Sequence, residues 1–217
     1  MASVSELRIS ETYLSLQGEG KHTGWPCFFI RTAVCDIRCR WCDTPHALMG
    51  GDRVNIDQLI ALIPDHVRLV QITGGEPLVQ HGPVLEVIKK LEARGKKVLL
   101  ETGGHRSLES VPATVHIVMD IKLPSSGEDR YNFAANLTYL KSSDEIKFVI
   151  ADRSDFDCAL QWMTEYHLAD ICEVLFSPVW DELELKELAE WILAAELPVR
   201  LQTQLHKHIW GGGTVGV

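Results

Sequence analysis

The 217-residue sequence lacks several features that define common classes of protein. No apolar run approaches the roughly 20 residues that a membrane-spanning helix needs. Residues 1–8 are polar and have no apolar core of the kind that a signal peptide carries. No internal repeat occurs, and the only low-complexity tract is the glycine run at 211–213. We therefore expect a cytoplasmic protein with no membrane partner.

An excess of basic residues is also missing. The chain has 21 Lys and Arg against 30 Asp and Glu, a net charge of −9. An acidic chain gains nothing from counterion release at phosphates, so we expect no nucleic-acid partner. The 46 % hydrophobic content is that of a globular protein. We expect one domain over 1–217, with 1–27 as an N-terminal arm and 211–217 as a flexible Gly-rich tail.

Of the six cysteines, only three are grouped. Cys35, Cys39 and Cys42 have the spacing CxxxCxxC. In a reducing compartment grouped thiols favour metal ligation over disulfides. A structural zinc site would need four ligands, commonly two CxxC pairs, and no second pair exists. Three thiolates on one loop suit an iron–sulfur cluster with one iron open to an external ligand, although zinc or buried free thiols remain alternatives.

Apolar stretches alternate with helical stripes along the chain. Strands are predicted at 7–16, 28–32, 69–72, 98–100, 116–119, 146–150, 174–176 and 199–201. Helices are predicted at 57–63, 84–91, 156–163 and 185–192. This alternation indicates parallel βαβ units. Because 107–114 and 124–143 hold no full helix, we expect an abbreviated α/β barrel of about six parallel strands, with fewer helices than strands.

Polar and glycine-rich residues follow several predicted strands. The chain reads Thr73-Gly74-Gly75-Glu76-Pro77 after one strand and Glu101-Thr102-Gly103 after the next. In α/β folds ligands bind at the carboxyl ends of the strands, and glycines let the backbone approach a ligand closely. These segments and the cysteine loop therefore predict one shared binding site.

These motifs resemble those of radical S-adenosylmethionine (SAM) proteins, and more narrowly the 7-carboxy-7-deazaguanine synthase family. The resemblance extends from about Ser10 to Trp210. It rests on Leu16-Gln17-Gly18-Glu19-Gly20, Arg31, the cysteine loop, Cys42-Asp43-Thr44, the TGGEP and Glu101-Thr102-Gly103 segments, and Gln204-Leu205-His206-Lys207.

The resemblance implies an activity. Members convert 6-carboxy-5,6,7,8-tetrahydropterin to 7-carboxy-7-deazaguanine with loss of ammonia, in the queuosine precursor pathway. They use a [4Fe–4S] cluster, SAM that is regenerated, and Mg²⁺. An electron from the cluster splits SAM, and the resulting 5′-deoxyadenosyl radical removes hydrogen from C6 of the pterin. Homodimers and a flavodoxin-type reductant are usual in this family.

The resemblance also implies residue roles, and it assigns no side chain as an acid or base. Substrate contacts, within and beyond the N-terminal arm, fall on Leu16, Gln17, Gly18, Arg31 and Thr73, with Arg31 on the carboxylate. SAM contacts fall on Gly74, Gly75, Glu76, Glu101, Asp120, Ile121, Lys122, Ser177, Pro178, Val179 and Trp180. Cluster ligands are Cys35, Cys39 and Cys42, and the Mg²⁺ ligand is Thr44. The chain reads Asp-Ile-Lys at 120–122 where many relatives read Ser-Pro-Lys.

Other interpretations remain open at this stage. Another radical SAM enzyme, such as a glycyl-radical activase, would share the cysteine loop and a GGEP-like turn. A non-enzymatic iron–sulfur protein would share only the cysteines. Arg31 could equally form a structural ion pair, and the region of His206 and His208 is predicted to be a polar loop.

Overall fold

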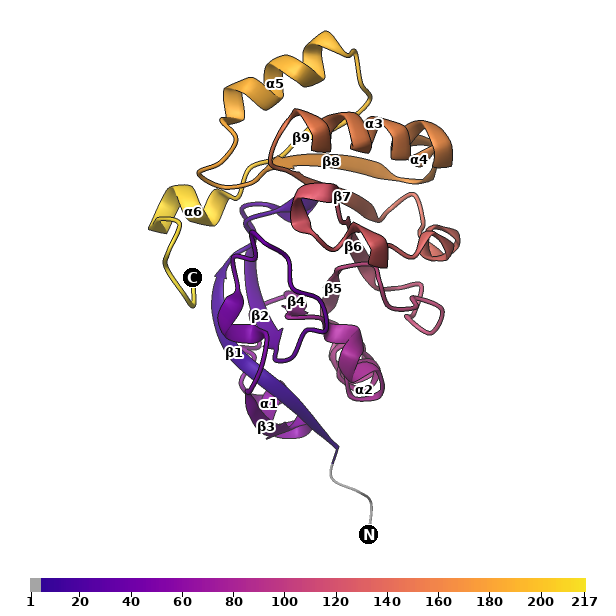
Figure 1. Ribbon diagram of the computed structural model, residues 1–217. Coiled ribbons are helices and arrows are strands. Elements are labelled where there is room, and N and C mark those ends of the chain that lie inside the picture. Colours follow the sequence, from indigo (N-terminus) through magenta and orange to yellow (C-terminus); the bar gives the residue numbers. More distant parts are fainter. Residues whose placement is uncertain (1–4) are drawn as a thin grey trace.

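A computed structural model describes residues 5–217, which build one curved sheet with helices along its outer face (Figure 1). The strand order is β3-β1-β2-β4-β5-β6-β7-β8-β9. Neighbours from β2 to β9 are parallel, whereas β1 is antiparallel to β2 and to β3. The strands are β1 (Glu6–Leu16), β2 (Pro26–Thr32), β3 (Asp52–Asn55), β4 (Leu69–Gly74), β5 (Lys97–Thr102), β6 (His116–Ile121), β7 (Glu145–Ile150), β8 (Glu173–Pro178) and β9 (Arg200–Leu201).

The α-helices are fewer than the strands in the described chain, as predicted. They are α1 (Ile56–Ala61), α2 (His81–Ala93), α3 (Arg153–Tyr166), α4 (Leu168–Ile171), α5 (Leu185–Ala194) and α6 (Leu205–Trp210). The connections β5–β6 and β6–β7 contain no α-helix, also as predicted. Local caps set two helix starts: Asn55 accepts from the first backbone N–H groups of α1, and Asp152 accepts from Asp155 in α3.

The strand count differs from the prediction. The parallel run contains seven strands rather than about six, and β1 and β3 extend it on one side. The short β3 has no clear alternation and was not predicted. Residues 6–16 of the predicted arm belong to the sheet as β1, and residues 1–4 of that arm lie outside the described residues. The α/β class and the mainly parallel sheet are confirmed.

The two edge strands, β3 and β9, do not pair with each other, so the sheet of residues 5–217 is open rather than closed into a barrel. The loop after β1 crosses this opening. The Gly20 N–H donates to Gln202 Oε1 at 2.6 Å, and the Leu205 N–H donates to Gly18 O at 3.0 Å. This loop therefore joins the first strands to the segment that follows β9.

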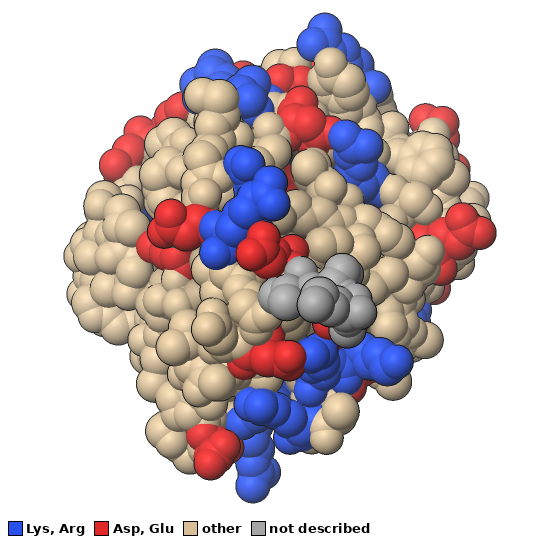
Figure 2. Space-filling model, turned by 90° about the horizontal axis from the view of Figure 1, so that it is seen from below, with Lys and Arg blue, Asp and Glu red and all other residues tan. Residues whose placement is uncertain are grey.

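The surface carries both signs of charge. Figure 2 shows Lys and Arg interspersed with Asp, Glu and uncharged residues on one face. Exposed pairs such as Arg153–Asp157, at 2.9 Å, add little to stability because water screens them. No helix in residues 5–217 is long and apolar enough to span a bilayer.

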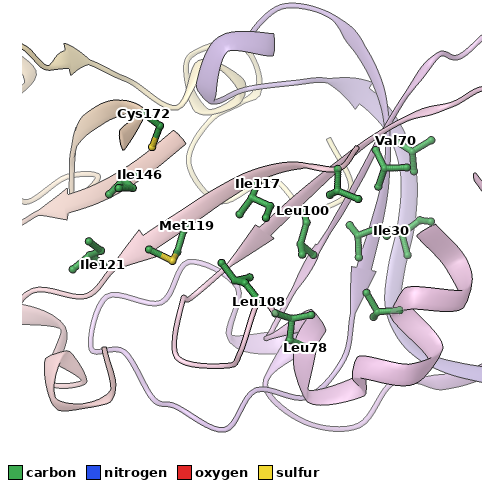
Figure 3. Close-up of a cluster of buried hydrophobic side chains, with 14 of the residues drawn as sticks. Ile30, Val70, Leu78, Leu100, Leu108, Ile117, Met119, Ile121, Ile146 and Cys172 are labelled. Atoms are coloured by element: carbon green, nitrogen blue, oxygen red, sulfur yellow. The ribbon is translucent and has the colours of Figure 1, made fainter. Parts of the chain in front are cut away.

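The main core fills the space between the sheet and its helices. Along each strand, alternate residues point outward into this core, including Ile30, Val70, Leu100 and Ile117 (Figure 3). Fully burying each such side chain contributes about 1.5–3 kcal/mol. The intervening residues point to the opposite, concave face of the sheet, and many of these are polar. This alternation separates a dry core from a polar interior.

Candidate functional site

A cavity of about 490 Å³ opens at the carboxyl ends of the parallel strands. Its lining includes the cysteine loop, the ends of β4, β5, β6, β7 and β8, the loop after β1, and α6. All but one of the predicted site residues line it: Leu16, Gln17, Gly18, Arg31, Cys35, Cys39, Cys42, Thr44, Thr73, Gly74, Gly75, Glu76, Glu101, Asp120, Lys122, Ser177, Pro178, Val179 and Trp180.

Ile121 is the exception. Side chains alternate along β6, so Asp120 and Lys122 face the cavity while Ile121 points into the core beside Met119 (Figure 3). Ile121 is only 4 % exposed. Its side chain therefore does not face the cavity, so a SAM contact from Ile121, which stays a prediction, would have to come from its main chain.

The GGEP turn is bonded directly to the start of the cysteine loop. The Gly75 N–H donates to Thr32 O at 3.0 Å, and the Glu76 N–H donates to Val34 O at 2.9 Å. A Cβ at Gly75 would lie 2.5 Å from Val34 O, so only glycine permits this contact. Val34 itself has φ = 77°, an unusual backbone conformation for a β-branched residue. The two predicted motifs thus form one structural unit.

The Glu76 side chain serves the fold rather than the cavity. It is fully buried, and its two oxygens accept from Leu78 N at 2.9 Å, Gly103 N at 2.8 Å and Thr102 Oγ1 at 2.9 and 3.0 Å. Burial raises the pKa of Glu76 although these donors oppose the rise. A SAM contact from Glu76 would therefore have to come from its main chain.

The far side of the cysteine loop is anchored on the segment after β6. The Arg38 N–H donates to Glu128 Oε1 at 2.7 Å, and Trp41 Nε1 donates to Ser125 Oγ at 3.1 Å. Burial raises the pKa of the Cys35 and Cys39 thiols. Within residues 5–217, no three His, Cys, Asp or Glu side chains are arranged to hold a single metal ion.

A buried charge network crosses the cavity wall, and the sequence analysis did not identify its centre. Lys147 Nζ lies 2.8 Å from Glu19 Oε2, 2.5 Å from Glu101 Oε1 and 3.3 Å from Asp120 Oδ1. Lys122 Nζ lies 2.9 Å from Asp120 Oδ2. The available signal was a lysine within the apolar strand Glu145–Ile150, at an inward position.

These contacts shift the pKa values of Glu101 and Asp120 in opposite directions. Burial raises the pKa of Glu101; Lys147 acts against this rise, and Glu19 and Asp120 add to it. Burial would also raise the pKa of Asp120, but Lys122 and Lys147 lower it below its usual value. Glu101 is thus the carboxylate of this network that most readily holds a proton.

Arg31 is an ion-pair partner, which the sequence analysis had left open. Its Nε donates to Glu11 Oε1 at 2.6 Å and its Nη2 to Tyr13 Oη at 2.8 Å. Nη1 lies 3.5 Å from Thr44 Oγ1, which itself donates to Asp43 Oδ1 at 2.9 Å. The Nε–Nη2 side of the guanidinium is therefore occupied by Glu11 and Tyr13. The outer edge, which carries Nη1, lies beside Thr44.

The last residues complete the cavity and correct one prediction. Residues 205–210 form α6 rather than a polar loop, and His206 of this helix packs so closely on Gly18 that a Cβ there would overlap the ring. His208 turns away to Thr203 Oγ1, at 2.7 Å. Residues 212–217 of the predicted flexible tail line the cavity mouth. Helix α6 and residues 212–217 therefore cover one side of the cavity.

The three cysteines outside the cysteine loop are Cys27, Cys158 and Cys172. Cys27 and Cys172 are buried, and burial raises the pKa of each thiol to about 12. Cys158 on α3 is only half-buried. None of these three cysteines lines the cavity.

Comparison with known proteins supplies the family. No protein-family model matches the chain. A 7-carboxy-7-deazaguanine synthase of Koribacter versatilis is 39 % identical over 226 residues, covering 97 % of this chain and 100 % of that protein. The enzyme of the same name from Chlorobaculum tepidum is 40 % identical over 221 residues and both chains are covered completely.

A solved structure supports the fold. The crystal structure of QueE from Escherichia coli matches with a TM-score of 0.75 at 24 % identity, covering 93 % of this chain and 95 % of that one. Together with the full-length sequence relatives, the cavity and its motifs lead to one conclusion: the chain belongs to the 7-carboxy-7-deazaguanine synthase family.

Proposed function

We propose that this protein is a radical SAM enzyme that contracts 6-carboxy-5,6,7,8-tetrahydropterin to 7-carboxy-7-deazaguanine with loss of ammonia. The observation that carries the proposal is the convergence of three clustered thiols, the GGEP turn and a polar strand-end wall on one cavity. The names of the full-length relatives support the same reaction.

The residues present fit the required cofactors. Cys35, Cys39 and Cys42 lie on one cavity-facing loop and could supply three soft sulfur ligands to a [4Fe–4S] cluster, which would leave one iron open. Because burial keeps Cys35 and Cys39 protonated, cluster loading would release protons from them. When bound, the cluster and SAM would supply the 5′-deoxyadenosyl radical. Gly74 and Gly75 line the cavity at the end of β4, where their backbone could contact SAM.

Thr44 and Asp43 offer hard oxygen atoms at the cavity wall, as Mg²⁺ prefers. The outer edge of Arg31 lies beside Thr44 and can receive the substrate carboxylate. In a chain of net charge −9, a buried anion needs such local cations. Arg31 and a Thr44-bound ion would thus hold the same end of the pterin.

We further propose that Lys147 keeps the polar wall of the cavity in place. By pairing with Glu19 and Glu101, it fixes the loop after β1 against the middle of the sheet. Gln17 in that loop donates to Gln71, whose Nε2 donates to Glu101 Oε2 at 2.7 Å. This continuous set of side chains can present fixed donors and acceptors to a pterin ring. A homodimer and a flavodoxin-type reductant complete the proposal.

Anaerobic reconstitution followed by incubation with SAM, a reductant and the carboxypterin tests the proposal. Mass spectrometry should detect 7-carboxy-7-deazaguanine. Arg31→Lys keeps the charge but loses the planar edge, so substrate binding should weaken by on the order of 1–3 kcal/mol. Thr44→Ala should reduce the response of the rate to added Mg²⁺ and leave the cluster spectrum unchanged. No product from the loaded, unaltered enzyme would refute the proposed reaction.

A further inference from the structure

His105 occupies an unassigned position between the two cofactor motifs. Its side chain is 6 % exposed and lines the cavity. Nε2 lies 2.7 Å from Oδ1 of Asp36, which follows Cys35 directly in the chain. Nδ1 lies 3.8 Å from Glu76 Oε2, beyond hydrogen-bond distance. The ring therefore bridges the cysteine loop and the GGEP turn, but only one of its nitrogens is bonded.

The bond to Asp36 determines the tautomer of the neutral ring. A carboxylate only accepts, so Nε2 carries the hydrogen and donates it to Asp36. Nδ1 then presents a lone pair. This atom is buried and has no hydrogen-bond partner among residues 5–217. Since buried polar atoms are normally paired, the unpaired Nδ1 of the neutral ring favours a donor from outside the described chain.

The fold holds this acceptor in one orientation. Asp36 is also bound by Arg106, which restrains the carboxylate that His105 contacts. The loop that carries His105 is fixed by Asn136, whose Nδ2 donates to Gly104 O at 2.9 Å and to Arg106 O at 2.7 Å. Preorganised groups of this kind bind ligands with little ordering cost.

The surroundings favour a particular kind of donor. Glu76 and Asp36 place carboxylates on both sides of the ring, so a positively polarised donor is preferred over an acceptor. A Cβ at Gly103 would lie 3.0 Å from Nδ1, so glycine keeps that side of the ring clear. The neighbouring GGEP turn is where the proposed function places SAM.

We propose that His105 Nδ1 accepts a hydrogen bond from bound SAM, with the amino group of its methionine portion as the donor. This inference rests on the proposed function. It adds a side-chain contact to SAM from the loop after β5. The Glu76 carboxylate cannot make this contact, because it is bonded to Leu78, Thr102 and Gly103. The competing explanation is that His105 only positions the cysteine loop through Asp36.

Two variants separate these roles. The amide of Gln reaches the place of Nε2, so His105→Gln can keep the donor to Asp36 but loses the acceptor at Nδ1. The amide of Asn reaches the place of Nδ1, so His105→Asn can keep an acceptor there but loses the bond to Asp36. His66→Gln is the matched control, because His66 is exposed and does not line the cavity.

The measurement is the affinity for SAM of each anaerobically reconstituted variant, by equilibrium dialysis, with iron content and the visible spectrum as loading checks. His105→Gln should bind SAM roughly three- to tenfold more weakly, the range expected for one lost hydrogen bond. His105→Asn should bind more tightly than His105→Gln, and His66→Gln should match the unaltered protein. Full affinity in His105→Gln, or equal affinity in the Gln and Asn variants, overturns the proposal.

A crystal structure of the unaltered holoenzyme with SAM tests the same contact even if a variant fails to load its cluster. A donor atom of SAM should lie within about 3.2 Å of Nδ1. Bound SAM with only carbon atoms or water beside Nδ1 refutes this inference alone. Failure of the loaded, unaltered enzyme to bind SAM refutes the proposed function instead.

Discussion

Replacement of Lys147 by Met gives the most direct test of the charge network. The side chain is 6 % exposed and contacts three carboxylates, on Glu19, Glu101 and Asp120. Met keeps the aliphatic volume and removes the charge, so these carboxylates lose their shared partner. Removing one partner of a buried ion pair costs about 3–5 kcal/mol, because the other charge stays buried without a partner. Because the cavity admits some water, we expect the lower end, about 3 kcal/mol of unfolding free energy.

The dependence of this loss on pH identifies its cause. Without Lys147, the main influence that opposes the raised pKa of Glu101 is gone, so that pKa rises further. The loss should be largest while Glu101 is ionised and should shrink as the pH falls through its raised pKa. Adding Glu101→Gln to Lys147→Met should restore part of the stability at neutral pH.

Equilibrium urea unfolding of the metal-free protein measures these changes. Lys186→Met is the control, because Lys186 is 86 % exposed and its pair with Glu190 contributes little. If Lys147→Met loses no more stability than Lys186→Met, the network does not stabilise this wall and the reasoning is wrong.

Three further predictions concern separate parts of the chain. Cys39→Ala should abolish cluster binding and turnover, whereas Cys158→Ala should leave iron content unchanged; full activity without Cys39 would contradict the cluster assignment. Burial and nearby cations lower the pKa of His22 to about 4, so the unfolded chain protonates first and stability falls between about pH 6.5 and 4. His22→Phe should make the urea midpoint of unfolding depend less on pH over that range, and an unchanged dependence on pH would contradict this. Asn136→Ala removes three hydrogen bonds of loop 104–108 and should cost about 3 kcal/mol in urea unfolding; a loss below about 1 kcal/mol would show that the loop is held otherwise.

The sequence was sufficient to predict the elements that have a strong pattern. Apolar strands followed by Gly74-Gly75 or Glu101 indicated both the parallel sheet and the edge at which the cavity lies. The short β3 has too few residues to show alternation, and α6 has only 6 residues of mixed polarity, so neither was predicted. Tertiary contacts, rather than local propensity, stabilise such short elements.

The sequence motifs indicated most of the residues that line the cavity, but Lys147 and His105, which lie outside these motifs, were missed. Ile121 was included together with Asp120 and Lys122, which line the cavity, but adjacent strand residues face opposite sides of a sheet, so the Ile121 side chain lies in the core. The same alternation, applied to β7, would have identified Lys147 as an inward-facing lysine. His105 could not be found in this way, because its place between Asp36 and Glu76 depends on contacts across the fold. Residues of this kind become visible only when the loops are in position.

The central proposal is that SAM bound in this cavity is split into methionine and a 5′-deoxyadenosyl radical, that the radical removes hydrogen from C6 of the carboxypterin, and that SAM is then re-formed. Its most direct test is incubation of the loaded enzyme with substrate deuterated at C6 and limiting SAM, followed by mass spectrometry. We predict many molecules of 7-carboxy-7-deazaguanine per SAM and deuterium in the recovered SAM. One 5′-deoxyadenosine released per product, or no deuterium in SAM, would contradict the account and favour a different radical SAM reaction.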